Sequence, residues 1–202
     1  AVGHLTFDAY TGQMSRSVAA PRRPDRRPAQ TIRRLLDAGA AELRAAPFSA
    51  LSMRSVAARA ELSPASAYTY FPSKNALVAN LYLETLKTVA LQPNTAESPK
   101  HRVTAAMRGM LLAGADQPGL TAACATAMLA DEPAVETARA EIAQEFARRI
   151  RSALGPGWRP EVAATLGLTF AGALMSARFL THEQTARQLE AAVDLVLGAA
   201  VG

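Results

Sequence analysis

Cysteine and histidine are scarce in this sequence of 202 residues, which holds one Cys and three His. The single cysteine, Cys124, cannot form an internal disulfide, and it excludes zinc sites built from pairs of cysteines. The histidines, His4, His101 and His182, lie too far apart in the sequence to form a local metal-binding motif. We therefore expect neither a metal site nor any other cofactor.

Long apolar runs are also missing. No stretch of about 18 uncharged apolar residues occurs, so the sequence predicts no membrane-spanning helix. The first residues are polar and acidic rather than basic and then apolar, which is not the pattern of a secretory signal. We expect a soluble protein of the cytoplasm.

Alanine, in contrast, makes up about a fifth of the chain, whereas aromatic residues make up 5%. Alanine has the highest helix propensity, and a chain with few aromatic residues has little to offer a pleated sheet. Apolar residues follow the helical period in segment after segment, without a convincing strand between them. The sequence therefore predicts an all-α protein of about nine helices.

Prolines, glycines and serines separate the predicted helices. Ser52, Ser63 and Ser73 each stand where a helix needs an N-cap, and Pro64 stands in a first turn, where its missing N–H costs nothing. Residues 92–100 are polar, contain two prolines and are predicted as a loop. The helices are expected at residues 31–43, 53–60, 65–71, 74–91, 102–113, 119–130, 134–154, 161–180 and 183–200.

Positive charge is concentrated in one part of the chain. Residues 14–74 hold eleven Lys and Arg against four Asp and Glu, a balance of +7, although the whole chain carries only +5. Residues 1–13 and 75–202 each have a balance of −1. This distribution is typical of a module that binds a polyanion, joined to an electrically neutral module.

The N-terminal segment has two parts. Residues 1–13 match nothing that follows, and we interpret Met14 as the native start and residues 1–13 as a leader. Residues 15–29 combine five arginines with three prolines, which prevent a packed element. We therefore expect residues 1–29 to form this leader and a flexible basic arm. The arm either contacts DNA or serves only as a solubilising tail.

Two short helices joined by a tight turn follow the first long helix, which is a helix-turn-helix pattern. The second helix of such a unit enters the major groove of DNA. Hydroxyl groups can donate to phosphate oxygens, and the small Ala65 lets the backbone approach the base edges. The hydroxyl and phenol groups of the second helix are those of Ser66, Tyr68, Thr69 and Tyr70. We predict a DNA-binding domain over residues 30–76.

One run within this segment is distinctive. It reads Tyr68-x-x-Phe71-x-x-Lys74-x-x-Leu77, and Ser63 and a Val-Ala pair at 56–57 precede it. Together with the first helix, over residues 31–77, it resembles the TetR family of transcriptional regulators. The resemblance implies an N-terminal helix-turn-helix domain of three helices. It also implies a C-terminal helical domain, over residues 77–202, for ligand binding and dimerisation.

The resemblance implies roles for individual residues. Arg54 matches a position that reads a guanine edge in some members, a contact worth ~1–3 kcal/mol of discrimination; the alternatives are a phosphate contact or a solvated side chain. Ser66 matches a hydroxyl position that meets DNA. Tyr68 and Tyr70 match positions that hold backbone phosphates, and a structural role is the alternative for Tyr68. Lys74 stands at a helix N-terminus, which favours a phosphate. The expected DNA-binding residues are Ser52, Arg54, Ser63, Ala65, Ser66, Tyr68, Tyr70 and Lys74.

Three positions depart from the family's pattern. Glu61 stands in the turn where glycine is usual, and because glutamate is strained at positive φ, we expect strain or an altered turn. Pro47 and Phe48 stand where a glycine is expected between the first two helices. Ala67 replaces a larger apolar residue of the core. We expect these departures to change helix angles and not the assignment.

No catalytic arrangement is evident in the sequence, which lacks a G-x-S-x-G elbow, a phosphate-cradling glycine loop and H-E-x-x-H. Cys124 lies in an apolar helix, and we interpret it as a buried, inert thiol. We therefore predict a DNA-binding regulator that is not an enzyme, and specifically a repressor that a small hydrophobic effector releases from a palindromic operator. The alternative is a helical ligand-binding or interaction protein without sequence-specific DNA recognition. The concentrated positive charge favours DNA.

Two helices near the C-terminus are predicted to form a homodimer interface. The first, residues 161–180, is rich in Ala and Gly and almost free of charge, and a helix that is apolar all round must be buried. With residues 183–200, two helices per subunit would form a four-helix interface across a two-fold axis. Burial within one subunit is the alternative.

An effector pocket is predicted in the C-terminal domain. Methionine is flexible and suits an adaptable apolar pocket, and the lack of charge favours a hydrophobic or amphipathic ligand. The alternative is that the same residues form an ordinary core. The residues expected to line the pocket are Met107, Met110, Leu111, Cys124, Met128, Phe146, Phe170 and Met175.

Overall fold

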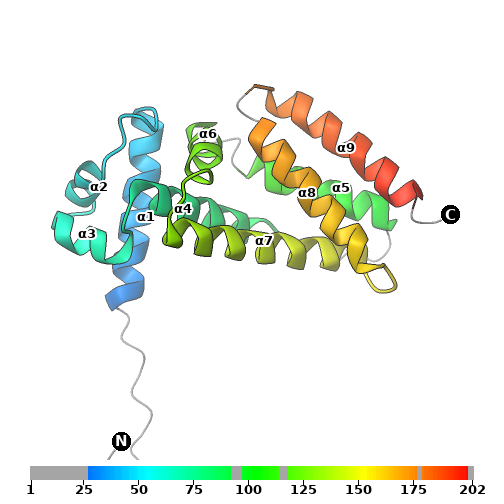
Figure 1. Cartoon of the computed structure of the whole chain (residues 1–202), viewed down its shortest axis with the longest axis horizontal. Helices are drawn as coiled ribbons and strands as arrows, with labels where there is room; N and C mark the ends of the chain where they lie inside the picture. The colour runs from blue at the N-terminus through cyan, green and yellow to red at the C-terminus, as the bar shows by residue number, and fades with distance from the viewer. Residues whose placement is uncertain (1–26, 92–96, 114–117, 177–178, 200–202) are drawn as a thin grey trace, which may run out of the picture. The chain divides into compact units, whose positions relative to one another are not determined.

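The computed structural model describes residues 27–91, 97–113, 118–176 and 179–199. Within these ranges the regular elements are nine α-helices, labelled in Figure 1, so the predicted all-α class and the number of helices are confirmed. The predicted leader and the basic arm up to residue 26 lie outside the described residues. The helices are α1 (Arg27–Ala45), α2 (Met53–Arg59), α3 (Pro64–Tyr70), α4 (Lys74–Thr88), α5 (Pro99–Leu112), α6 (Pro118–Ala127), α7 (Pro133–Leu154), α8 (Pro160–Ser176) and α9 (His182–Ala199).

The chain divides into two units, residues 1–31 and residues 32–202. In the first unit the structure describes only the opening of α1, where Thr31 Oγ1 donates to the carbonyl of Arg27 at 2.9 Å. The second unit holds the rest of α1 and all the other described helices. The domain division predicted at residue 76 stays a prediction.

Two helices begin earlier than the sequence predicts. α1 begins at Arg27, so the expectation of a flexible arm as far as residue 29 was wrong. Pro28 permits this start, because an N–H in the first helical turn has no intrahelical partner to lose. α5 begins at Pro99, inside the predicted loop, since Ser98 Oγ accepts a hydrogen bond from the N–H of His101 at 3.2 Å and caps the helix.

The three serines predicted as N-caps do cap their helices. Ser52 Oγ accepts from the N–H of Ser55 at 3.1 Å, and Ser63 Oγ accepts from the N–H of Ser66 at 3.1 Å. Ser73 Oγ accepts from the N–H at residue 76 at 3.0 Å. Each cap satisfies one of the N–H groups that a helix start leaves without a partner. The boundaries of α2, α3 and the start of α4 follow from these three bonds.

α4 is the helix around which the second unit is built. It contacts α6 and α7, α5 in turn contacts α7 and α9, and α8 contacts α7 and α9. Figure 1 shows α8 and α9 side by side. Apolar side chains are buried on several sides of α4, among them Leu77, Leu81 and Leu86, because α4 has neighbours on more than one side. This central helix joins the helix-turn-helix to the rest of the unit.

Two glycines allow α1 to lie close to its neighbours. A Cβ added at Gly39 would lie 3.1 Å from Leu77 Cδ2 of α4. A Cβ added at Gly119 of α6 would lie 2.8 Å from the carbonyl oxygen of Leu43 in α1, closer than real Cβ atoms approach a backbone atom. α1 therefore lies close to α4 at Gly39 and close to α6 at Leu43.

Candidate nucleic-acid interface

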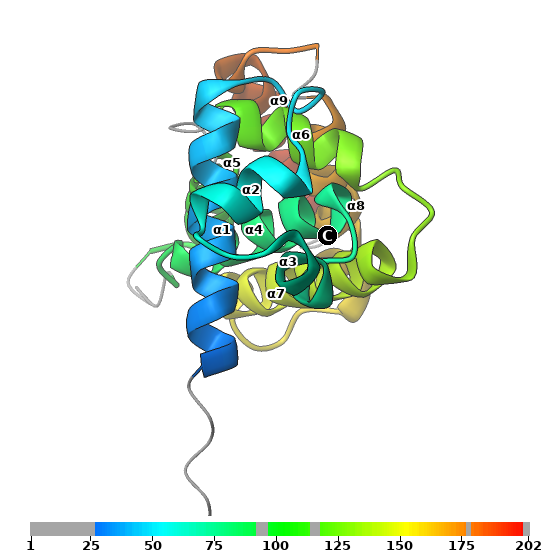
Figure 2. The same ribbon diagram turned by 90° about the vertical axis from the view of Figure 1, so that its left-hand side faces the viewer.

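The helix-turn-helix consists of α2, α3 and the turn between them, and both helices face the viewer in Figure 2. α2 buries Met53, Val56 and Ala57. α3 buries Ala67, whose side chain is 0% exposed, and Phe71 follows the helix as a second buried anchor. Because the buried side chain of Ala67 is small, the backbone of α3 can lie close to the core. The size of residue 67 therefore sets the distance between α3 and the core.

The turn after α2 contains the strain that the sequence predicts. Glu61 has φ 53°, in the left-handed region that favours glycine. Its N–H donates to the carbonyl of Ala58 at 3.1 Å, and the N–H of Leu62 donates to the carbonyl of Ala57 at 2.9 Å. This pair of bonds is a Schellman C-cap with glutamate in the place of glycine.

Arg34 of α1 holds this turn from outside. Its Nη2 donates to the carbonyl of Ala60, and it lies 3.2 Å from Glu61 Oε2. The guanidinium thus satisfies a carbonyl at the end of α2 and pairs with the strained glutamate. A neighbouring ion pair joins the same helices, because Arg59 Nε donates to Glu42 Oε1 at 2.6 Å. The hydrogen bond from Arg59, and a second from Ser55, lower the pKa of the Glu42 carboxyl group.

Lys74, predicted to bind a phosphate, is already engaged within the fold. Its Nζ donates to the carbonyls of Phe48 at 3.1 Å and Leu51 at 3.3 Å. It also lies 4.5 Å from the centre of the Phe48 ring, which is cation–π distance. Through these hydrogen bonds and the cation–π contact, the ammonium group connects the segment between α1 and α2 to the start of α4. Phe48, which stands where a glycine was expected, provides both a carbonyl and a ring for this contact.

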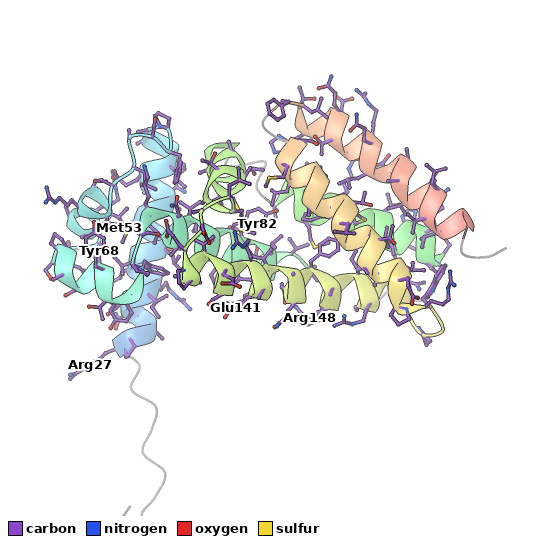
Figure 3. The ribbon with its side chains drawn as sticks, viewed as in Figure 1. Arg27, Met53, Tyr68, Tyr82, Glu141 and Arg148 are labelled. Atoms are coloured by element: carbon purple, nitrogen blue, oxygen red, sulfur yellow. The ribbon has the colours of Figure 1, made fainter. Side chains whose placement is uncertain are left out.

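The eight predicted DNA-binding residues lie along α2, α3 and the start of α4, and five of them are exposed. Tyr68, labelled in Figure 3, is 49% exposed on α3. Ser66 and Lys74 are half-buried, and half-buried Tyr70 lies against the core. Arg54 is exposed and has no side-chain partner among the described residues. The exposed five are Ser52, Arg54, Ser63, Ala65 and Tyr68.

One residue that the sequence analysis does not single out as functional, Glu132, joins the segment before α7 to the start of α4. Its Oε1 accepts from Asn75 Nδ2 at 2.6 Å, and its Oε2 accepts from the hydroxyl of Ser73. The two hydrogen bonds lower the pKa of the Glu132 carboxyl group, with that from Ser73 as the larger cause. The partners are more than fifty residues apart in the sequence, so no local pattern could have identified the contact.

The eight residues predicted to line an effector pocket all belong to one hydrophobic core. Met128 and Met175 are half-buried and the other six are buried. The rings of Phe146 and Phe170 stack with their centres 4.7 Å apart, which joins α7 to α8. The thiol of Cys124 is 0% exposed, and burial raises its pKa to about 12, as an inert core cysteine requires.

A buried phenol stands beside that thiol. Tyr82 of α4, labelled in Figure 3, is 2% exposed, and burial together with the neighbouring Cys124 raises its pKa. Within the described ranges, no helix is long and apolar enough to cross a membrane. In the same ranges, no group of three or more His, Cys, Asp and Glu side chains is arranged to hold a metal ion.

Comparison with known proteins places this geometry among transcriptional regulators. Residues 35–81 match the family described as bacterial regulatory proteins, tetR family. The chain is 40% identical over 180 residues to an HTH-type transcriptional regulator of Mycobacterium tuberculosis, and the match covers 87% of this chain and 84% of that relative. A regulator of Mycobacterium bovis matches with the same identity and coverage.

Solved structures share the fold. A TetR transcriptional regulator from a Rhodococcus species has a TM-score of 0.72 at 21% identity, and the match covers 84% of this chain and 97% of that chain. The TetR-family repressor FadR of Thermus thermophilus, solved with lauroyl-CoA, has a TM-score of 0.67 at 16% identity. That match covers 82% of this chain and 93% of FadR. The likeness includes the helix-turn-helix and the helices that follow it.

Proposed function

Because the chain belongs to the TetR family of DNA-binding transcriptional regulators, we propose that it is a cytoplasmic repressor that a small hydrophobic effector releases from a palindromic operator. Membership of this family makes the chain a regulator and not an enzyme. In our proposal, residues 30–76 bind DNA and residues 77–202 bind the effector and dimerise.

The observation that carries this proposal is the outward face of α2 and α3. Arg54, Ser63, Ala65 and Tyr68 are exposed there, on two helices whose other sides are held by the core and by Arg34. The face belongs to the stretch of residues 14–74 that holds the positive charge of the chain. An exposed helix pair within a positively charged segment suits the major groove and its phosphates.

The operator can be tested by recovering genomic fragments with the full chain. We expect the fragments to share a palindrome, since a two-fold dimer presents two identical helix pairs. Arg54→Ala should reduce recovery of these fragments, because it removes an exposed cation without a partner among the described residues. Arg159→Ala removes the same charge from an exposed position between α7 and α8 and should leave recovery unchanged. Fragments without a shared sequence, or equal effects of the two variants, would refute the proposal.

An exposed apolar face on α8 and α9 supports the proposed homodimer. Leu168 is 77% exposed and Leu195 is 75% exposed, although each lies in the middle of a helix. Small residues continue the two stripes at helical spacing, and a Cβ added at Gly172 or Gly198 would meet nothing within 4 Å. Nothing among the described residues of one subunit therefore requires these glycines, whereas a closely packed partner helix would. The small exposed residues are Ala164, Ala171 and Gly172 on α8 and Ala191 and Gly198 on α9.

A charged substitution on this face tests the dimer without disturbing the core. Leu168→Glu combined with Leu195→Glu should yield a monomer by light scattering at micromolar concentration, because two charges per subunit would be buried without partners. Leu129 is 66% exposed but lies outside α8 and α9, so Leu129→Glu is the matched control and should remain dimeric. A wild-type monomer, or a double variant that stays dimeric, would contradict this part of the proposal.

The proposed effector is hydrophobic because the candidate pocket residues are apolar and include four methionines. They come from α5, α6, α7 and α8, except Met128, which directly follows α6, so a ligand among them would contact most of the C-terminal helices. The structure of FadR with lauroyl-CoA supports a long acyl chain as the first class of compound to try. Tyr82 would supply a polar group beside this apolar region.

Effector binding and DNA binding should oppose each other. A compound that weakens DNA binding tenfold must itself be weakened tenfold by DNA, a coupling of about 1.4 kcal/mol. We expect a fatty acid or fatty acyl-CoA that raises the melting temperature of the full chain to release it from the recovered duplex. If no such compound both raises the melting temperature and releases the duplex, this class of effector is wrong.

A further inference from the structure

The recognition helix α3 has an unusual set of side chains. Its seven residues read PASAYTY and include no Arg, Lys, Asn, Gln, Asp or Glu. Its exposed residues are Pro64, Ala65, Tyr68 and Thr69. Bidentate recognition of guanine needs Arg or Lys, recognition of adenine uses Asn or Gln, and recognition of cytosine uses Asp or Glu. α3 therefore has none of the side chains that read base edges by paired hydrogen bonds.

The two aliphatic hydroxyl groups of α3, those of Ser66 and Thr69, form hydrogen bonds within the protein. Thr69 Oγ1 donates to the carbonyl of Ala65 at 3.0 Å, which directs its hydroxyl proton back along the helix. Ser63 Oγ and Ser66 Oγ lie 2.9 Å apart and share a hydrogen bond. Ser63 Oγ also accepts from the N–H of Ser66. The groups that remain for a base edge are the methyl groups of Ala65 and Thr69, the side chain of Tyr68 and the one hydroxyl proton that the Ser63–Ser66 pair does not use.

Of the four bases, only thymine presents an apolar group in the major groove that could contact the methyl groups of α3. Thymine carries a C5-methyl group there, and alanine and the threonine methyl group are established partners for it. We infer that α3 recognises thymine methyl groups through Ala65 and Thr69. Arg54 of α2, exposed and without a partner among the described residues, then reads guanine beside them. This inference rests on the proposed DNA-binding function. It predicts that each half-site of the operator contains thymine beside guanine.

Uracil substitution tests the inference directly, because uracil keeps every hydrogen-bonding group of thymine and lacks only the C5-methyl. The probe is a duplex selected from a random pool by the full-length chain, with thymines replaced by uracil one at a time. We expect a three- to tenfold loss of affinity at one or two positions of each half-site and none elsewhere. A second series with 7-deazaguanine should locate the guanine that Arg54 contacts.

Thr69→Ser is the matched variant, since serine keeps the hydroxyl that donates to Ala65 and removes only the methyl group. It should weaken binding to the thymine duplex, have no further effect where uracil has already removed the partner methyl, and leave the salt dependence unchanged. A duplex that binds with full affinity after every uracil substitution would overturn this inference and leave the proposed function intact. A random pool from which the chain selects no sequence would overturn both.

Discussion

At the scale of single residues, Glu61 is the position where local chemistry and backbone geometry conflict. A residue with a Cβ in the left-handed region is destabilised by about 1–2 kcal/mol. The exposed ion pair of Glu61 with Arg34 contributes at most about 1 kcal/mol to the free energy of unfolding. The turn is therefore imposed by the packing of α2 and α3 and by the bond from Arg34 to the Ala60 carbonyl.

Glu61→Gly and Glu61→Ala separate the two contributions. Both variants lose the ion pair, but only alanine keeps the strained Cβ, so we expect the glycine variant to be the more stable by ~1 kcal/mol. Elsewhere in a protein, alanine is normally the better choice of the two. Chemical denaturation of both variants measures the difference. An alanine variant as stable as the glycine variant would show that residue 61 does not hold a positive φ in solution.

Lys74 shows the limit of assigning residues one by one. The sequence correctly predicts that Lys74 lies at the start of a helix. It does not predict the hydrogen bonds from Lys74 to the carbonyls of Phe48 and Leu51. Those carbonyls can accept from Lys74 because the segment between α1 and α2 is not helical, as Pro47 indicates in the sequence; the Phe48 carbonyl also accepts from the N–H of Leu51 at 3.2 Å. A variant of Lys74 therefore changes the fold as well as any phosphate contact, whereas Arg54 provides a clean test of DNA binding.

At the scale of helices, the starts follow from the sequence better than the ends. Ser52, Ser63 and Ser73 cap the residues directly after them, so the spacing along the chain contains the information. The end of α4 was predicted at residue 91 and lies at Thr88. There Arg149 of α7 donates to the carbonyl of Lys87 at 3.1 Å and to that of Val89.

Arginine side chains bind the carbonyls at other helix ends in the same way. Arg102 of α5 donates to the carbonyls of Ala153 at 2.7 Å and Leu154 at 3.1 Å, at the end of α7. Arg139 of α7 donates to the carbonyl of Met128 at 2.8 Å, just after α6. Each guanidinium belongs to a different helix from the one whose end it binds. The apolar period of a helix therefore does not predict where such a bond ends it.

Gly119 tests how α1 and α6 approach each other. An exposed Gly→Ala change in a helix normally stabilises by up to ~1 kcal/mol. Because the added Cβ would lie 2.8 Å from the Leu43 carbonyl oxygen, we expect Gly119→Ala to lower the free energy of unfolding by about 1–3 kcal/mol instead. Ala122→Ser, at an exposed position of the same helix, should change it by less than about 0.5 kcal/mol. A stabilised Gly119→Ala variant would mean that the two helices lie further apart.

At the scale of the whole molecule, Glu132 is the polar contact between the start of α4 and the segment before α7. It accepts hydrogen bonds from Ser73 and Asn75, the residues on either side of Lys74. The end of α4 that we propose to lie near DNA is thereby connected to the segment before α7, a helix that contains one of the proposed effector residues, Phe146. Sequence reasoning does not find this contact, because it depends on tertiary structure.

The pH dependence of stability tests the Glu132 contact. Its folded pKa is lowered, so the stabilisation is present above the ordinary glutamate value of 4.5 and is lost as the pH falls through the folded pKa. The wild type should therefore be more stable than Glu132→Gln at pH 7, with a difference that shrinks below pH 4.5. Asp131→Asn, at the exposed neighbouring position, should show no such trend. A difference independent of pH would contradict an ionised Glu132 contact.

The central claim is that the chain reads DNA sequence through α2 and α3. The most direct measurement is the affinity of the full-length wild type and Arg54→Ala for the selected duplex and for a scrambled duplex, over a range of salt concentrations. We predict that log K falls with log salt by roughly 0.9 for each phosphate neutralised, and that Arg54→Ala weakens binding to the selected duplex far more than to the scrambled one. Equal affinity for both duplexes, or binding that does not change with salt, would contradict the claim.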